Sequence, residues 1–232
     1  MAREKEDKST TVTGAGQAAK QILDEIVSGD LRAGSRLYIR DLIMRTGFGP
    51  TPLREGMSRL VASGLVEASD QRGFKVTPIE RSDVNDYTAY RLLHEQEAVR
   101  QSIKYGDVDW EGAVSAAVVA MEHYTALPRE RRRDALSRYS DTHKGFHAAL
   151  VSACPSPRLK SNMALLLDQE KFYCHNLVTA DEPLSDLVRL HPVGEHRALA
   201  EAVISRDADT ASRLLADHQW KLADEMRSRL TE

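Results

Sequence analysis

The sequence is poor in cysteine, contains no long run of apolar residues and carries almost no excess charge of either sign. Its two cysteines, Cys154 and Cys174, form neither a CxxC pair nor a disulfide framework, so we expect buried free thiols in a reducing compartment. No apolar run could span a bilayer and no secretory signal opens the chain, which predicts a cytoplasmic protein without a membrane partner. The formal net charge of -3 excludes a uniformly basic protein, so binding to nucleic acid would need a local basic surface.

What the sequence does contain is a helix, turn, helix and hairpin pattern over residues 37–76. The first helix is predicted over Ile39–Thr46 and ends at residues 47–50, because glycine admits positive φ and proline cannot continue a helix. The second is predicted to have Thr51 as its N-cap and Pro52 at its first helical position, where a missing N–H costs nothing. Its apolar face is formed by Leu53, Met57, Leu60 and Val61.

Two short strands, Leu65–Ala68 and Gly73–Val76, follow around a polar tip and complete the pattern of a winged helix-turn-helix. Arg54, Ser58 and Arg59 fall off the apolar face of the second helix and are expected to point outward. A short helix with outward arginines beside a basic-tipped hairpin suits a DNA major groove, where guanidinium groups hold phosphates or read guanine edges. The alternative is a small helical domain whose arginines are only solvated.

Four fragments of this region keep an order and separations that are typical of one family. They are Gly34–Leu37, Thr51–Glu55, Ser63–Val66 and Arg72–Val76. In these residues the region resembles the N-terminal domain of GntR-type transcriptional regulators. The resemblance implies that DNA is contacted by Arg40, Thr51 and Arg54 and, at the tip of the wing, by Arg72 and Gly73. The turn departs from the family, since many relatives have Ser or Thr and then Arg where this chain has Gly49-Pro50, so their operator sequences do not transfer.

The chain is predicted to consist of three segments and to be mainly α. Residues 1–13 are polar and are expected to be a disordered tail, 14–79 form the winged helix-turn-helix with its small β-hairpin wing, and 80–232 form an all-α bundle of about six helices. The basic run Arg129–Arg133 is expected to be solvated and not a second nucleic-acid site. The small core of the first domain is predicted to contain Ile22, Ile26, Leu37, Leu42, Leu53, Met57 and Leu60. Helices are predicted over residues 17–28, 82–105, 108–126, 129–153, 157–178, 184–206 and 208–229.

Histidines are the most informative polar residues of the second domain. His143 and His147 are four residues apart and share a helix face, while His196 and His218 lie on two further predicted helices. Imidazoles on three helices can converge inside a bundle, and they are the commonest ligands of zinc-like metals. The alternative is that these side chains cap or fill the core. Other histidines, His123, His175 and His191, are predicted to be surface residues.

Further fragments connect this domain to a second family. They are Arg91–Glu95, the HxxxFH element that ends at His147, Glu195–Arg197 and Ser205–Asp209 before His218. In these residues it resembles the FCD effector-binding and dimerisation domain of the FadR-like branch of GntR regulators. The resemblance implies a divalent metal, expected to be zinc with nickel or manganese as alternatives, held by His143, His147, His196 and His218. His143 stands where many relatives have Asp or Asn, which removes a negative charge from the site.

The same resemblance implies that the metal and Arg91 together hold the carboxylate of a small organic acid, to which a guanidinium fork is suited. Arg91 has a second, compatible role in the prediction, an ion pair with Glu95 four residues later. Residues 107–111 and the fragments of the first domain look most like regulators that respond to dicarboxylates in carbon-starvation and glutarate-type catabolism. Lys171–Tyr173 departs from an arginine-tyrosine-arginine element of that group, which leaves the identity of the ligand open.

The function expected from these observations is that of a bacterial transcriptional repressor and not an enzyme. A homodimer would bind a pseudo-palindromic operator in double-stranded DNA, and a small carboxylate, a dicarboxylate in the group it resembles, would release it. Two alternatives stay open. One is a metal-dependent hydrolase built on the histidines with Glu195 as its base, and the other is a DNA-binding regulator whose metal site is only structural.

Overall fold

The structure is a computed structural model that describes residues 13–69, 73–128, 136–177 and 188–230. The chain divides into two compact units, one with the residues up to Ile26 and Leu31–Thr77, and one with Val27–Asp30 and the residues from Pro78 onwards. The predicted fold class is confirmed, because the described elements are helices and one small antiparallel sheet. Among these residues no helix is both long and apolar enough to cross a membrane.

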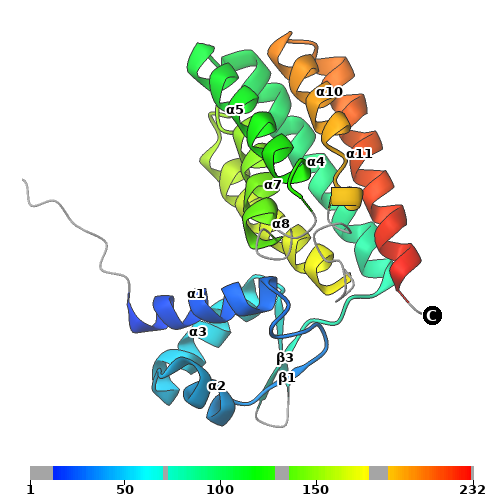
Figure 1. The fold of residues 1–232 in the computed structure, drawn as a ribbon. Helices are drawn as coiled ribbons and strands as arrows, with labels where there is room; N and C mark the ends of the chain where they lie inside the picture. Colours follow the sequence, from blue (N-terminus) through cyan, green and yellow to red (C-terminus); the bar gives the residue numbers. More distant parts are fainter. Residues whose placement is uncertain (1–12, 70–72, 129–135, 178–187, 231–232) are drawn as a thin grey trace, which may run out of the picture. The chain divides into compact units, whose positions relative to one another are not determined.

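The first unit is a winged helix with three helices and a three-stranded sheet (Figure 1). Its elements are α1 (Gly14–Val27), β1 (Arg36–Leu37), α2 (Ile39–Thr46), α3 (Pro50–Ala62), β2 (Val66–Ser69) and β3 (Gly73–Val76). The strand order is β1-β3-β2 and both pairs are antiparallel, with Arg36 opposite Lys75 and Val66 opposite Val76. The sequence does not predict β1, because two residues are too few to show an alternating pattern.

Single residues set the ends of the helices in the helix-turn-helix. Gly47 ends α2 with a φ of 76°, the left-handed conformation that favours glycine. The predicted start of α3 is wrong, because Gly49 is the N-cap and Pro50 already occupies the first helical position. The fixed φ of Pro50 and its missing N–H suit that position. Thr51 is therefore a helical residue with an exposed side chain and not the cap.

The packing of α1 against α3 closes the core of this unit. Helix α1 begins ahead of its predicted start, because Thr13 Oγ1 accepts a hydrogen bond from the Gly16 backbone N–H at 3.2 Å. At Gly56 of α3, a Cβ atom would lie 3.0 Å from the backbone nitrogen of Ala19 and 3.1 Å from the carbonyl oxygen of Ala15. The predicted core is confirmed, since the following side chains are all buried: Ile22, Ile26, Leu37, Leu42, Leu53, Met57 and Leu60.

The second unit is a bundle with six long helices in its described part (Figure 1). They are α4 (Arg81–Tyr105), α5 (Val108–Thr125), α7 (Leu136–Leu150), α8 (Pro157–Leu177), α10 (Val193–Ile204) and α11 (Ala208–Arg229). Neighbours in space follow the closed order α4, α11, α10, α5, α7, α8 and back to α4. Each helix therefore packs against at least two others, and the ring encloses one common core.

Two of the predicted helices differ from those in the structure. The helix predicted over residues 184–206 is interrupted at Pro192, and α10 starts only at Val193. Proline has no N–H to donate and its ring obstructs the preceding turn, so Pro192 serves as the N-cap. The helix predicted from Arg129 is described only from Leu136, as α7, and the basic run Arg129–Arg133 lies outside the described residues.

Replacing Gly56 by alanine should lower the free energy of unfolding by about 1–3 kcal/mol, because the new methyl group would press on the backbone of α1. The matched control is Gly112→Ala in α5, where a Cβ atom meets nothing within 4 Å. There the better helix propensity of alanine should raise stability by up to about 1 kcal/mol. Urea denaturation of the full chain measures both changes, and equal effects would contradict the close packing of α1 on α3.

Candidate functional site

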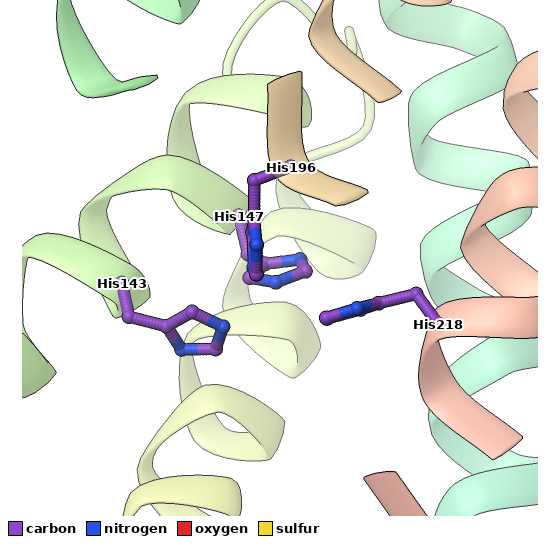
Figure 2. Close-up of side chains that lie close together, drawn as sticks. All are labelled: His143, His147, His196 and His218. Carbon is purple, nitrogen blue, oxygen red and sulfur yellow. The ribbon is translucent and has the colours of Figure 1, made fainter. Parts of the chain in front are cut away.

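Four histidines of the second unit meet in the core of the bundle (Figure 2). His143 and His147 come from α7, His196 from α10 and His218 from α11. One ring nitrogen of each lies within 4.8 Å of the others, and all four residues are at most 4% exposed. The fold thus brings together the four side chains that the sequence singles out.

In each of these rings, Nδ1 lies against an oxygen atom. Three of the oxygens belong to carboxylates and one to a backbone carbonyl. The Nδ1 distances are 2.6 Å to Glu95 for His147, 3.2 Å to Glu170 for His143, 2.9 Å to Glu195 for His218 and 2.9 Å to the Pro192 carbonyl for His196. Because such oxygens only accept, Nδ1 carries the hydrogen in the neutral ring and Nε2 carries the lone pair.

The Nε2 atoms of all four histidines are buried and have no hydrogen-bond partner within the described residues. Such atoms are rare in proteins, because a buried polar group without a partner costs about 1–3 kcal/mol. Four imidazole nitrogens gathered at one place, each with its other nitrogen on an acceptor, form a donor set that suits a zinc-like ion. The residues present therefore fit a divalent metal.

Burial keeps these imidazoles in the form that binds metal. Desolvation lowers the pKa of His143 and of His196 well below the usual 6.5, and neighbouring imidazoles lower it further. For His147 desolvation outweighs the opposing effect of the Glu95 carboxylate and brings the pKa to about 4. The rings of His143, His147 and His196 are thus neutral at neutral pH, and no proton has to leave them before a metal binds.

A buried ion network supports the histidines. The Arg91 guanidinium has no exposed surface and pairs through Nε with Glu95 at 2.9 Å and through Nη1 with Glu170. Burial alone would raise the pKa of Glu95, but the charge of Arg91 and the hydrogen bonds that Arg91 and His147 donate bring it down to about 2. The predicted Arg91–Glu95 pair is confirmed. The third nitrogen of the guanidinium, Nη2, has no hydrogen-bond partner in the described part of the chain.

Two histidines that the sequence assigns to the surface are buried, so that prediction is wrong. His191 is 3% exposed and stacks on His143 with the ring centroids 3.7 Å apart. His175 is 8% exposed, and its Nε2 lies 2.5 Å from Ser140 Oγ. Polar contacts offset the cost of burying such groups, and the spacing of apolar residues does not reveal those contacts. His123 is exposed, as predicted.

The residues predicted to bind DNA lie on α2, α3 and the wing of the first unit. Arg40 on α2, and Thr51 and Arg54 on α3, have exposed side chains. Thr51 and Arg54 lie three residues apart and so share one face of α3. Gly73 is the first residue of β3, and Arg72 lies outside the described residues. Contacts of these residues with DNA stay a prediction.

Two family models match the chain, one for each unit. The model of the gntR family of bacterial regulatory proteins matches residues 15–76, and the FCD domain matches residues 86–219. The uncharacterized HTH-type transcriptional regulator BphR of Paraburkholderia xenovorans is 37% identical over 198 residues, which cover 84% of this chain and 77% of the relative. The HTH-type transcriptional repressor GlaR of Escherichia coli is 28% identical over 199 residues, which cover 84% of this chain and 87% of the relative.

Solved structures share the fold over nearly the whole chain. Escherichia coli McbR/YncC has a TM-score of 0.74 and 17% identity, and the match covers 94% of this chain and 99% of that one. A putative transcriptional regulator GntR from Rhodococcus sp. RHA1 has the same TM-score of 0.74 with 19% identity, and the same coverage of 94% and 99%. At these identities the likeness shows the fold alone.

Removing the carboxylate behind His218 should weaken metal binding without removing a ligand. We expect Glu195→Ala to lower the affinity for Zn²⁺ by about 10–100-fold, because Glu195 orients the ring of His218 and makes it more basic. Glu201→Ala, at an exposed position of the same helix, is the matched control and should leave the affinity unchanged. Competition with a chromophoric chelator measures both, and equal affinities in the two variants would speak against a metal at the four histidines.

Proposed function

We propose, because the chain belongs to the gntR family of bacterial regulatory proteins and carries an FCD domain, that it is a repressor that a small carboxylic acid releases from its operator. One relative, GlaR, is a repressor, which supports repression and not activation as the action of the DNA-bound protein. The observation that carries the ligand response is the group of four histidines with unpartnered Nε2 atoms within the described residues. The proposal includes a cytoplasmic homodimer and membership of the FadR-like branch.

In this proposal the first unit provides the surface that binds DNA. Thr51 and Arg54, exposed on α3, would face the major groove of the DNA. Arg40 and the wing residues Arg72 and Gly73 would contact the sugar-phosphate backbone of the DNA. Phosphate contacts fix the register of the protein on the duplex, and contacts to base edges give specificity. A homodimer would present two such surfaces to the two halves of a pseudo-palindromic operator.

The second unit would provide the ligand site. His143, His147, His196 and His218 would hold the ion, which is expected to be zinc, with nickel and manganese as alternatives. When bound, the ion would supply a Lewis acid that attracts a carboxylate oxygen. Arg91 would donate a hydrogen bond to the same carboxylate from Nη2, the guanidinium nitrogen that has no partner in the described residues.

The ligand can release DNA only if it prefers the arrangement of the dimer that does not bind the operator. A preference of about 1–3 kcal/mol corresponds to a change in operator affinity of about 5–150-fold. A ligand with equal affinity for both arrangements would shift nothing, however tightly it bound. The response therefore depends on how the ligand changes the bundle and not on the strength of binding alone.

A second candidate is a regulator whose metal is only structural. It is favoured by the donor set, because four protein nitrogens complete the tetrahedral shell that zinc has in closed structural sites. The hydrolase alternative has no such support. Glu195, the base that it would need, has one oxygen 2.9 Å from His218 Nδ1 and the other 2.8 Å from Lys221 Nζ.

A small carboxylic acid should raise the melting temperature of the metal-loaded chain and should lose this effect after chelation, because the metal is part of the proposed site. Thermal denaturation with a panel of C2–C6 mono- and dicarboxylic acids measures the effect. Adding Zn²⁺ back to the chelated protein is the control and should restore it. Stabilisation that is independent of the metal would show that the ion is not part of the ligand site. If none of the acids stabilises the protein, the carboxylate response is contradicted and the regulator with a structural metal is the candidate that fits.

Arg54→Ala should weaken binding to operator DNA by about 5–150-fold, because one good contact to a base edge contributes about 1–3 kcal/mol of discrimination. Arg59→Ala is the matched control. It removes the same charge from the same helix, about 140° away around the helix axis, and should have a much smaller effect. Fluorescence anisotropy with duplexes selected from a random pool measures both. Equal losses would show that α3 contributes only general electrostatic attraction.

A further inference from the structure

Exposed apolar side chains gather on one side of the second unit, where α4 packs between α8 and α11. Two hydrogen bonds show which parts of these helices lie at the same level along the bundle. Tyr87 donates to the carbonyl of Leu166 on α8, and Gln219 on α11 donates to Glu95. Close to these contacts along the helices, four large apolar residues are exposed: Tyr90 by 50%, Leu93 by 69%, Leu165 by 37% and Trp220 by 38%. We call these four residues the α4 patch.

The composition of the α4 patch is typical of a surface that binds another protein. Monomeric proteins rarely leave several large apolar residues exposed near one another. Tyrosine and tryptophan are enriched at protein interfaces, where their rings contribute much of the binding energy. Tyr90 on α4 and Trp220 on α11 are residues of this kind. The patch therefore predicts a partner whose own surface is partly apolar.

The exposed side of α4 also has the spacing of a helix that packs along a second helix. The residues on it are Asp86, Tyr90, Leu93, Glu97 and Arg100, and all of them are exposed or half-buried. They follow one another at intervals of four, three, four and three residues. An average step of about 3.5 residues is that of helices that pack side by side over several turns. Arg91 and Glu95, on the other side of α4, are fully buried and face the bundle core.

The charges along this side of α4 match those of a second copy of the same helix. Asp86 and Arg100 lie seven residues before and after Leu93, which is about two turns in each direction. If two copies of α4 run antiparallel with Leu93 at the symmetry axis, Asp86 of each copy lies opposite Arg100 of the other. Asp86 has no ion-pair partner in the described part of the chain. Arg100 pairs with Glu97 of its own helix, but both side chains are exposed, so the pair contributes little and leaves Arg100 accessible.

We propose that two copies of this chain associate through the α4 patch, with their α4 helices antiparallel. Leu93 then meets its symmetry mate at the two-fold axis, and Tyr90 and Trp220 pack around it. Asp86 pairs with Arg100 of the second copy, and the two-fold symmetry forms this pair twice. The assignment rests on the homodimer of the proposed function and adds to it the surface and the relative direction of the two bundles.

The outer side of α5 is the main competing surface in the described part of the second unit. Val108 and Val119 of this helix are exposed by 77% and 64%. However, α5 contains no lysine or arginine that could meet its acidic residues on a second copy. Its exposed valines also lie eleven residues apart, about three turns, whereas Tyr90 and Leu93 are neighbours on one face of α4. The α4 patch is therefore the better self-complementary surface.

The first test replaces the residue at the proposed axis of the full-length, zinc-loaded protein. Leu93→Asp should raise the dissociation constant of the dimer by about 100-fold or more, because two carboxylates would meet at the axis without a partner. Val119→Asp, at an exposed apolar position of α5, is the matched control and should leave the constant unchanged. Sedimentation equilibrium over a range of protein concentrations measures both. Circular dichroism should show the same helix content in both variants, since both positions are exposed.

The second test reverses the charges that would pair across the axis. Asp86→Arg alone and Arg100→Asp alone should each raise the dissociation constant by about fivefold or more at low salt, because each places two like-charged pairs in the dimer. The double variant Asp86→Arg with Arg100→Asp restores opposite charges and should return the constant close to that of the wild type. The effect of the single variants should shrink at high salt, which screens exposed charges.

These measurements use neither DNA nor a carboxylic acid, so they are independent of the proposed repression and ligand response. A wild-type protein that stays monomeric would contradict the homodimer, and the α4 interface with it. A wild-type dimer that Leu93→Asp does not weaken would contradict only the α4 interface. If Val119→Asp separates the copies and Leu93→Asp does not, the interface lies on α5. If the double charge reversal is as weak as the single variants, the antiparallel pairing of Asp86 with Arg100 is wrong.

Discussion

A buried guanidinium is the interaction on which the second unit depends. Arg91 of α4 pairs with Glu95 of its own helix and with Glu170 of α8, and these two carboxylates lie against His147 and His143 of α7. Breaking such a pair leaves an uncompensated buried charge, which costs about 3–5 kcal/mol. Helices α4, α7 and α8 are therefore tied to one arrangement, and two of the four imidazoles are oriented before any metal binds.

Much of this fold could be predicted, because the helices of the bundle are long and strongly periodic. The predicted bounds of α4, α5 and α11 differ from those observed by at most one residue. The predicted starts of α3 and α10 are wrong, because each start depends on a single proline, Pro50 in α3 and Pro192 before α10. The preference of proline for the start of a helix depends on its own φ and its missing N–H, which the spacing of apolar residues does not report.

The site could be predicted in part, for a different reason. Spacing on one helix places His143 beside His147, His196 and His218 lie on two further predicted helices, and the resemblance to a known domain implies that all four form one site. The buried positions of Glu170 and His191 could not be predicted, because they depend on contacts between segments that lie far apart in the sequence. Polar side chains that are buried in pairs are exceptions to the rule that apolar residues lie inside and charged ones outside, so the sequence pattern does not predict them.

The positions of the four histidines also concern how much folded protein a cell contains. The two cysteines are free thiols, so no disulfide joins the helices of the bundle. An ion shared by α7, α10 and α11 would be a cross-link between distant parts of the chain, and its binding energy would add to the stability of the folded state. A cell short of metal would then hold less of this regulator, because a less stable chain is degraded faster. Metal supply would thus set the amount of the regulator as well as its response.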